Sequence, residues 1–128
     1  MVGNTLALGV DAVDIAEFAR LIDGPAKQHL NRYFNDCELA SAGATEGRIE
    51  KLASRFAIKE AVLKALGTGW GDGIAFTDVV VGTRASGAPS IMLYRDLAAT
   101  AARLGIKSWL VSASHTSTVV FASVIALS

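Results

Sequence analysis

The chain lacks several features that mark whole classes of protein. It has one cysteine, Cys37, so it can form neither an internal disulfide nor a multi-cysteine zinc cluster. Its 12 basic and 12 acidic side chains cancel, whereas general nucleic-acid binders and polybasic membrane binders are strongly basic. The first residues include no basic leader followed by a long apolar core, so we expect no secretory signal. These absences predict a cytoplasmic protein with neither nucleic acid nor membrane as a partner.

One uncharged stretch, residues 108–128, has the length of a membrane span. It contains several serine and threonine side chains and His115, which a lipid-facing helix would leave without hydrogen-bond partners. Two paired strands explain this segment better than a membrane helix.

The length and the apolar content favour one folded unit. The chain has 128 residues, which fits a single domain over residues 1–128. With 52% hydrophobic and 19% charged residues, it carries far more apolar material than a disordered chain. Because monomers rarely expose large apolar patches, this surplus also indicates that another subunit covers part of the surface.

Periodicity and capping signals predict an α+β domain. Asp14 is a plausible N-cap, with Glu17 at the capping-box spacing. The expected helices cover residues 14–23, 30–34, 35–43, 46–66 and 97–105. The expected strands cover residues 6–11, 74–81, 90–94, 106–113 and 119–127. Helices and strands do not alternate regularly, so we expect a mostly antiparallel sheet packed against the one long helix.

The long helix carries an apolar stripe that should face the sheet. At about 100° per residue, the stripe consists of Ile49, Leu52, Phe56, Leu63 and Leu66. Lys59 falls inside this stripe and Glu60 on its border, so both should be at least partly buried. In the plainer interpretation, Lys59 extends out to solvent and Glu60 pairs with Lys64.

Cations on this helix favour a second interpretation, an anion site. Arg55 and Lys59 are separated by one turn and carry the same charge, which is unfavourable unless an anion lies near them. Lys64 adds a further cation, and a glycine-rich segment, residues 67–73, follows. Glycines allow a backbone to approach phosphate closely, although a simple helix end would also explain the segment.

Two carboxylates are candidates for a metal site. Asp11 ends the first expected strand and Glu60 lies on the long helix; if they converge, they suit Mg²⁺, which commonly takes one or two carboxylates. Asp14 competes as a ligand, but its spacing to Glu17 favours helix capping. His115 lies in the turn between the last two strands, where a hydrogen-bonded turn residue and a phosphate contact are equally plausible.

Three motifs in order resemble the holo-acyl-carrier-protein synthases, the small bacterial 4′-phosphopantetheinyl transferases. The motifs are Gly9-Val10-Asp11, the run from Arg55 to Gly69 that includes Lys59-Glu60-Ala61, and Ser112-Ala113-Ser114-His115-Thr116. Phe34 with Glu38, and the Gly87-Ala88-Pro89 turn, also match.

The resemblance implies an activity. These enzymes move 4′-phosphopantetheine from coenzyme A to a serine of an apo acyl carrier protein and release adenosine 3′,5′-bisphosphate. It implies a trimer of single-half transferase folds with sites between subunits, and a carrier from fatty-acid or polyketide synthesis.

The same resemblance implies roles for individual residues. Asp11 and Glu60 would hold Mg²⁺, and Lys64 would neutralise the departing bisphosphate. Either Glu60 or a metal-bound water would act as the base. The expected coenzyme A contacts are Arg55, Lys59, Lys64, Gly67, Gly69, Pro89 and His115. The alternatives are a coenzyme A-binding module without turnover and a structural oligomer in which Lys59 and Glu60 form a buried pair.

Overall fold

The computed structural model describes residues 3–23, 29–68 and 75–128 and contains the expected elements in the expected order. The helices are α1 (Ile15–Ile22), α2 (His29–Tyr33), α3 (Asp36–Ala42), α4 (Arg48–Ala65) and α5 (Arg95–Arg103), with a 3-10 turn, η1 (Phe76–Asp78). The strands are β1 (Thr5–Asp14), β2 (Val79–Thr83), β3 (Pro89–Leu93), β4 (Ser108–His115) and β5 (Val119–Leu127). The α+β class with antiparallel pairing is confirmed.

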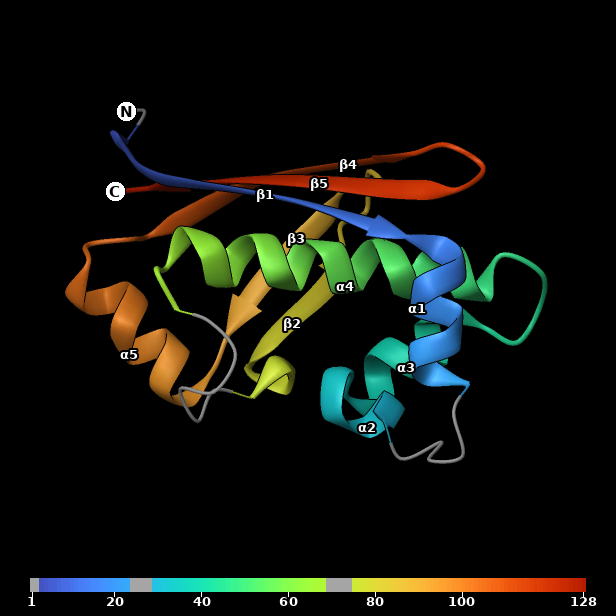
Figure 1. Ribbon diagram of the computed structural model, residues 1–128. Coiled ribbons are helices and arrows are strands. Elements are labelled where there is room, and N and C mark those ends of the chain that lie inside the picture. The colour runs from blue at the N-terminus through green and yellow to red at the C-terminus, as the bar shows by residue number, and fades with distance from the viewer. Residues whose placement is uncertain (1–2, 24–28, 69–74) are drawn as a thin grey trace.

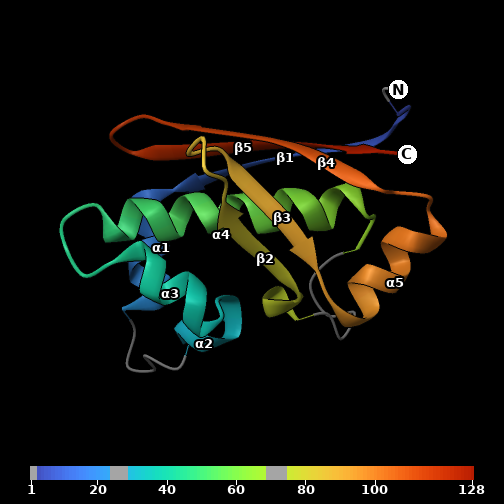
Figure 2. The ribbon, with the colours of Figure 1, turned by 180° about the vertical axis from the view of Figure 1, so that it is seen from behind.

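The strands form two sheets. One has the order β1-β5-β4, and the other is the β2-β3 hairpin. The three-stranded sheet lies along one side of α4, and the hairpin crosses α4 on another side (Figures 1 and 2). The expected strand over 74–81 begins later, at Val79, because η1 occupies Phe76–Asp78. Residue 74 and most of the glycine-rich segment lie outside the described residues.

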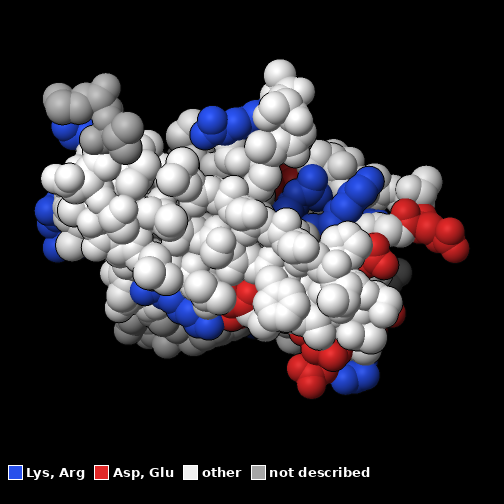
Figure 3. Space-filling model, turned by 90° about the horizontal axis from the view of Figure 1, so that it is seen from above, with Lys and Arg blue, Asp and Glu red and all other residues white. Residues whose placement is uncertain are grey.

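The outer face of the three-stranded sheet is exposed and uncharged, with large hydrophobic side chains among serines. Register places Leu8, Ile125 and Leu110 in one row across the strands. Figure 3 shows a broad area without Lys, Arg, Asp or Glu over this sheet. The large hydrophobic residues exposed on this face are Leu8, Val10, Leu110 and Phe121. None of the helices in the described part of the chain has the length and hydropathy of a membrane span.

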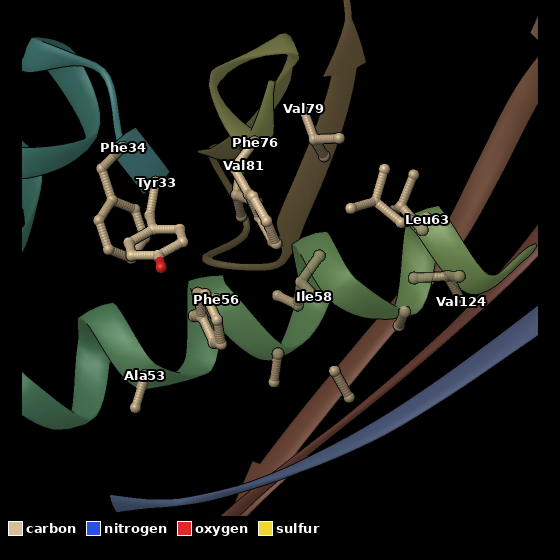
Figure 4. Packing of buried hydrophobic residues seen from close by; sticks show 14 of the residues in the cluster. Tyr33, Phe34, Ala53, Phe56, Ile58, Leu63, Phe76, Val79, Val81 and Val124 are labelled. Carbon is tan, nitrogen blue, oxygen red and sulfur yellow. The ribbon is translucent and has the colours of Figure 1, made fainter. Parts of the chain in front are cut away.

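Helix α4 is buried on more than one side, which corrects the expectation of a single stripe facing the sheet. The Phe56 ring, in that stripe, packs against Tyr33 from α2 and Phe76 from η1, with centroid distances of 5.2 and 5.5 Å. Figure 4 shows these rings on one side of α4, with β1 on the other. The sheet side of α4 uses small residues such as Ala61 instead. Two layers cover α4, so no single stripe describes its buried surface.

Side-chain caps set where two of the short helices begin. The Asp14 carboxylate accepts a hydrogen bond from the Glu17 amide at 2.9 Å, as its spacing predicts. Asn35 and Glu38 form a reciprocal capping box at the start of α3, with distances of 2.8 and 3.0 Å. The capping box orients Glu38, which is 2% exposed, toward the interior.

We predict that Gly9→Ala destabilises the fold. A Cβ on Gly9 would lie 1.9 Å from the Ala61 carbonyl oxygen, so β1 and α4 would have to move apart. Such overpacking costs about 1–3 kcal/mol, which chemical denaturation measures. Ala85→Ser, at an exposed position in the turn between β2 and β3, is the control and should change stability by less than about 0.5 kcal/mol. Equal stabilities of Gly9→Ala and the wild type would contradict the close contact.

Candidate active site

Asp11 is a buried carboxylate at the interface between β1 and α4. Its residue is 7% exposed, and Gly9 on the same face of β1 lets α4 approach closely. Lys64 donates to Asp11 Oδ1 at 2.8 Å and to the Val10 carbonyl at 3.1 Å. Asp11 Oδ2 is buried and has no hydrogen-bond partner. A buried oxygen of this kind is costly unless a ligand satisfies it.

Lys64 and Glu60 belong to the same charged cluster. The hydrogen bond to Asp11 raises the pKa of Lys64 above 10.5, and the charges of Asp11 and Glu60 add to this effect. Glu60 is half-buried. Because Lys64 stays protonated at neutral pH, it supplies a fixed positive charge beside the two carboxylates. We call Asp11, Glu60 and Lys64 the carboxylate cluster.

This cluster has the composition of a Mg²⁺ site. Mg²⁺ commonly binds one or two protein carboxylates and keeps several waters. Among the described residues, no group of three or more His, Cys, Asp or Glu side chains is arranged to hold a metal. Asp11 and Glu60 are two, and the unpartnered Asp11 Oδ2 is an oxygen that such an ion would satisfy.

A separate cleft of about 390 Å³ lies between α4, the β2-β3 hairpin and the end of β4. Its polar lining includes Lys51, Ser54 and Arg55 from α4, together with His115 from β4. Arg55 Nη1 is buried without a hydrogen-bond partner. Burial lowers the pKa of Arg55 and the charge of Glu38 opposes that change. An anion in the cleft would give the orphaned guanidinium group a partner.

The other residues that were expected to contact coenzyme A lie in different parts of the structure. Pro89 lines the cleft at the start of β3, and exposed His115 contacts the Thr116 carbonyl at 3.2 Å. Gly67 follows the end of α4 with φ +75, a conformation that favours glycine. Gly69 lies outside the described residues.

Lys59 is buried, as its place on the helix predicts, but it does not lie at an anion site. Its ammonium is fully buried and donates to Glu38 Oε1, at 2.7 Å, and to two carbonyl oxygens. The expected phosphate contact and the alternative of a solvent-exposed Lys59 both differ from this placement. The physical reason is that α4 has a second buried side, on which Lys59 lies with a complete set of acceptors.

The predicted residues therefore form two groups instead of one anion site. Arg55 and Lys64 are nine positions apart, which places them about 180° apart around a helix. The cleft lining includes Arg55, Pro89 and His115 but none of the carboxylate cluster. The structure brings together Asp11 with Lys64, and Arg55 with His115, on different sides of α4.

Sequence reasoning missed Lys51, and it named Glu38 in the resemblance without assigning it a role. Lys51 precedes Arg55 by one turn, so the same spacing argument could have found it as a second cation of the cleft. Glu38 had no such signal, because its partners Lys59 and Val81 are 21 and 43 positions away.

Comparisons with known proteins identify the family of the chain. A family model of the 4′-phosphopantetheinyl transferase superfamily matches residues 7–120. A holo-[acyl-carrier-protein] synthase of Anaeromyxobacter sp. (strain K) is 41% identical over 123 residues, which cover 94% of each chain. The chain therefore belongs to the holo-[acyl-carrier-protein] synthases.

Solved structures show the same fold. The synthase from Neisseria meningitidis aligns with a TM-score of 0.87 and 28% identity, covering 98% of this chain and 100% of that one. The Helicobacter pylori synthase in complex with coenzyme A aligns with a TM-score of 0.80 and 27% identity, covering 93% and 98%.

We predict that Asp11→Asn lowers the pKa of Lys64 toward its ordinary value of 10.5. Because the pKa is raised in the folded chain, the stabilisation by this pair is complete below pH 10.5 and is lost as pH rises through the higher folded value. Titration of the lysine side-chain NMR signals, with Asp96→Asn as a control at an exposed acid, measures the change. An unchanged Lys64 titration in Asp11→Asn would show that Asp11 is not its main partner.

Proposed function

We propose that this chain transfers 4′-phosphopantetheine from coenzyme A to a serine of an apo acyl carrier protein. In this reaction the serine oxygen forms a bond to the coenzyme A β-phosphorus, and the bond to adenosine 3′,5′-bisphosphate breaks. Named relatives and a relative's coenzyme A complex support the substrate and the transfer. The observation that carries the proposal is Asp11, which has one oxygen held by Lys64 and the other buried without a partner.

Asp11 and Glu60 would hold Mg²⁺ in this reaction. The bound ion would supply positive charge to the diphosphate as negative charge builds up on its oxygens. Lys64, held by Asp11 and by the Val10 carbonyl, adds its own charge and neutralises the bisphosphate as it leaves. The carboxylate next to it, Glu60, is the protein group available to take the proton of the carrier serine.

The cleft would bind the nucleotide part of coenzyme A. Arg55 and His115 would contact its phosphate groups, and the Pro89 turn would form an apolar wall. Gly67 and Gly69 would let the backbone after α4 approach the phosphates. These contacts bind the part of the substrate that does not react, so they contribute mainly to affinity.

We further propose a homotrimer with its active sites between subunits. The carboxylate cluster and the cleft lie on different sides of α4, so a complete site would combine the cluster of one subunit with the cleft of the next. The exposed, uncharged face around Leu8, Leu110 and Phe121 is a surface that another copy would cover. The single cysteine agrees with a reducing, cytoplasmic location for the reaction.

We predict that Asp11→Asn and Glu60→Gln each lower the transfer rate by about 100-fold or more, because each removes negative charge from the metal site at nearly constant volume. Incubation with coenzyme A, Mg²⁺ and several apo carriers, followed by mass spectrometry of the carriers, measures the transfer. Asp96→Asn, at an exposed acid on α5, should retain full activity. Near-normal transfer by Asp11→Asn would contradict the metal site, and a wild type that modifies no carrier would contradict the proposed function.

We predict that Leu8→Lys dissociates the oligomer. Leu8 is 66% exposed on this uncharged face, where an unpaired charge would be buried on assembly. Light scattering after size exclusion should give three times the chain mass of 13.3 kDa for the wild type and a smaller mass for the variant. Met92→Lys, with 58% exposure on the hairpin, is the matched control and should remain a trimer. A monomeric wild type would overturn the assembly.

A further inference from the structure

A buried ion pair lies next to the cleft without forming part of its lining. Lys59 and Glu38 are 0% and 2% exposed, and their charged atoms are 2.7 Å apart. Lys59 also donates to the Tyr33 and Phe76 carbonyls, at 2.6 and 3.1 Å, and lies over the Phe34 ring. All these interactions are made within the protein, so neither side chain is available to a ligand in the cleft.

Glu38 joins two elements that form walls of the cleft. Its Oε1 accepts from Lys59 on α4, and its Oε2 accepts from the Val81 amide on β2 at 2.9 Å. Ile58 precedes Lys59 and lines the cleft on the α4 side, and Val81 lines it on the hairpin side. One carboxylate therefore ties the α4 wall to the β2 wall.

Glu38 also supports the charge of Arg55. Arg55 lies one turn before Lys59 on α4, and its Nη1 is buried without a hydrogen-bond partner. The Glu38 charge favours the ionised forms of both Arg55 and Lys59, against the cost of burying them. The loss of this carboxylate would leave two cations near each other without their shared counter-charge.

We propose that Glu38 and Lys59 are positioning residues for coenzyme A binding: their buried ion pair holds α4 and β2 at the separation that the nucleotide requires. This inference rests on the proposed function. The pair touches no substrate and acts through Arg55 and the hairpin. Its removal should therefore weaken the binding of coenzyme A more than it slows the chemical step, which occurs at the carboxylate cluster on another side of α4.

Only a charged carboxylate satisfies the Glu38 position. Its three partners are the backbone N–H groups of Asn35 and Val81 and the Lys59 ammonium, and all three are donors. A glutamine has a single acceptor oxygen, so its own amide group must face at least one of these donors. Glu38→Gln thus breaks part of the link between the walls with almost no change in volume.

The test compares Glu38→Gln, Lys59→Met and the double variant Glu38→Gln/Lys59→Met in the transfer assay with saturating carrier. Each single change leaves a buried group without its partner, whereas the double variant removes both charges and should fold best. We expect the double variant to raise the KM for coenzyme A about tenfold, the equivalent of one charge-assisted hydrogen bond, with a much smaller change in kcat.

Leu97→Ala is the matched control. Leu97 is 1% exposed in α5, away from the cleft, so this variant loses stability through a cavity while the cleft stays intact. We expect a lower melting temperature and an unchanged KM for coenzyme A. A destabilised enzyme has a smaller folded fraction, which lowers apparent kcat without a change in KM, and this distinguishes the two effects.

The outcomes separate this inference from the proposed function. A folded double variant whose KM for coenzyme A equals that of the wild type would overturn the positioning role. The proposed function would still stand in that case, provided that the wild-type enzyme modifies a carrier. An equal KM increase in Leu97→Ala would also overturn it, because the effect would then follow from lost stability alone. A wild type that transfers nothing would overturn both.

Discussion

The arrangement of this protein depends on the burial of α4 between two layers. The three-stranded sheet covers one side, and the hairpin with α2 and η1 covers the other (Figures 1 and 2). On the sheet side, Gly9 has no side chain, so its strand lies directly against the Ala61 carbonyl. This close approach is also what brings Asp11, two residues along β1, within 2.8 Å of Lys64. The packing constraint and the geometry of the carboxylate cluster therefore have the same origin.

The sequence predicted the elements well because their signals are local. Asp14 and Glu17 lie three positions apart, and the long helix contains no proline. The division into two sheets was not predictable in this way, because strand pairing joins distant segments. The same limit applies to Lys59: its position on the helix indicated burial, but its acceptors at Tyr33, Glu38 and Phe76 come from three other segments.

At the candidate site, the sequence indicates which residue types take part but not where they lie relative to one another. The sequence indicates Asp11 as a carboxylate in an unusual position and Lys64 as one of several cations on the long helix, and the structure pairs them directly. A single anion site on this helix would require Arg55 and Lys64 to share a helix face, but their spacing places them about 180° apart. Helix geometry alone is therefore enough to assign Lys64 and Arg55 to different sites. The partners of each come from distant segments of the chain, which helix geometry does not identify.

The buried charged groups around α4 differ in how many of their polar atoms have partners. Lys59 has three acceptors and its partner Glu38 has three donors, so that pair is complete within one chain. Asp11 keeps one buried oxygen without a partner, and Arg55 keeps one buried nitrogen. Buried polar atoms are costly unless they are bonded. A pair whose hydrogen bonds are all made within the chain therefore suits a structural role. A carboxylate and a guanidinium group that each lack a hydrogen-bond partner suit a cation site and an anion site, respectively, before their ligands bind.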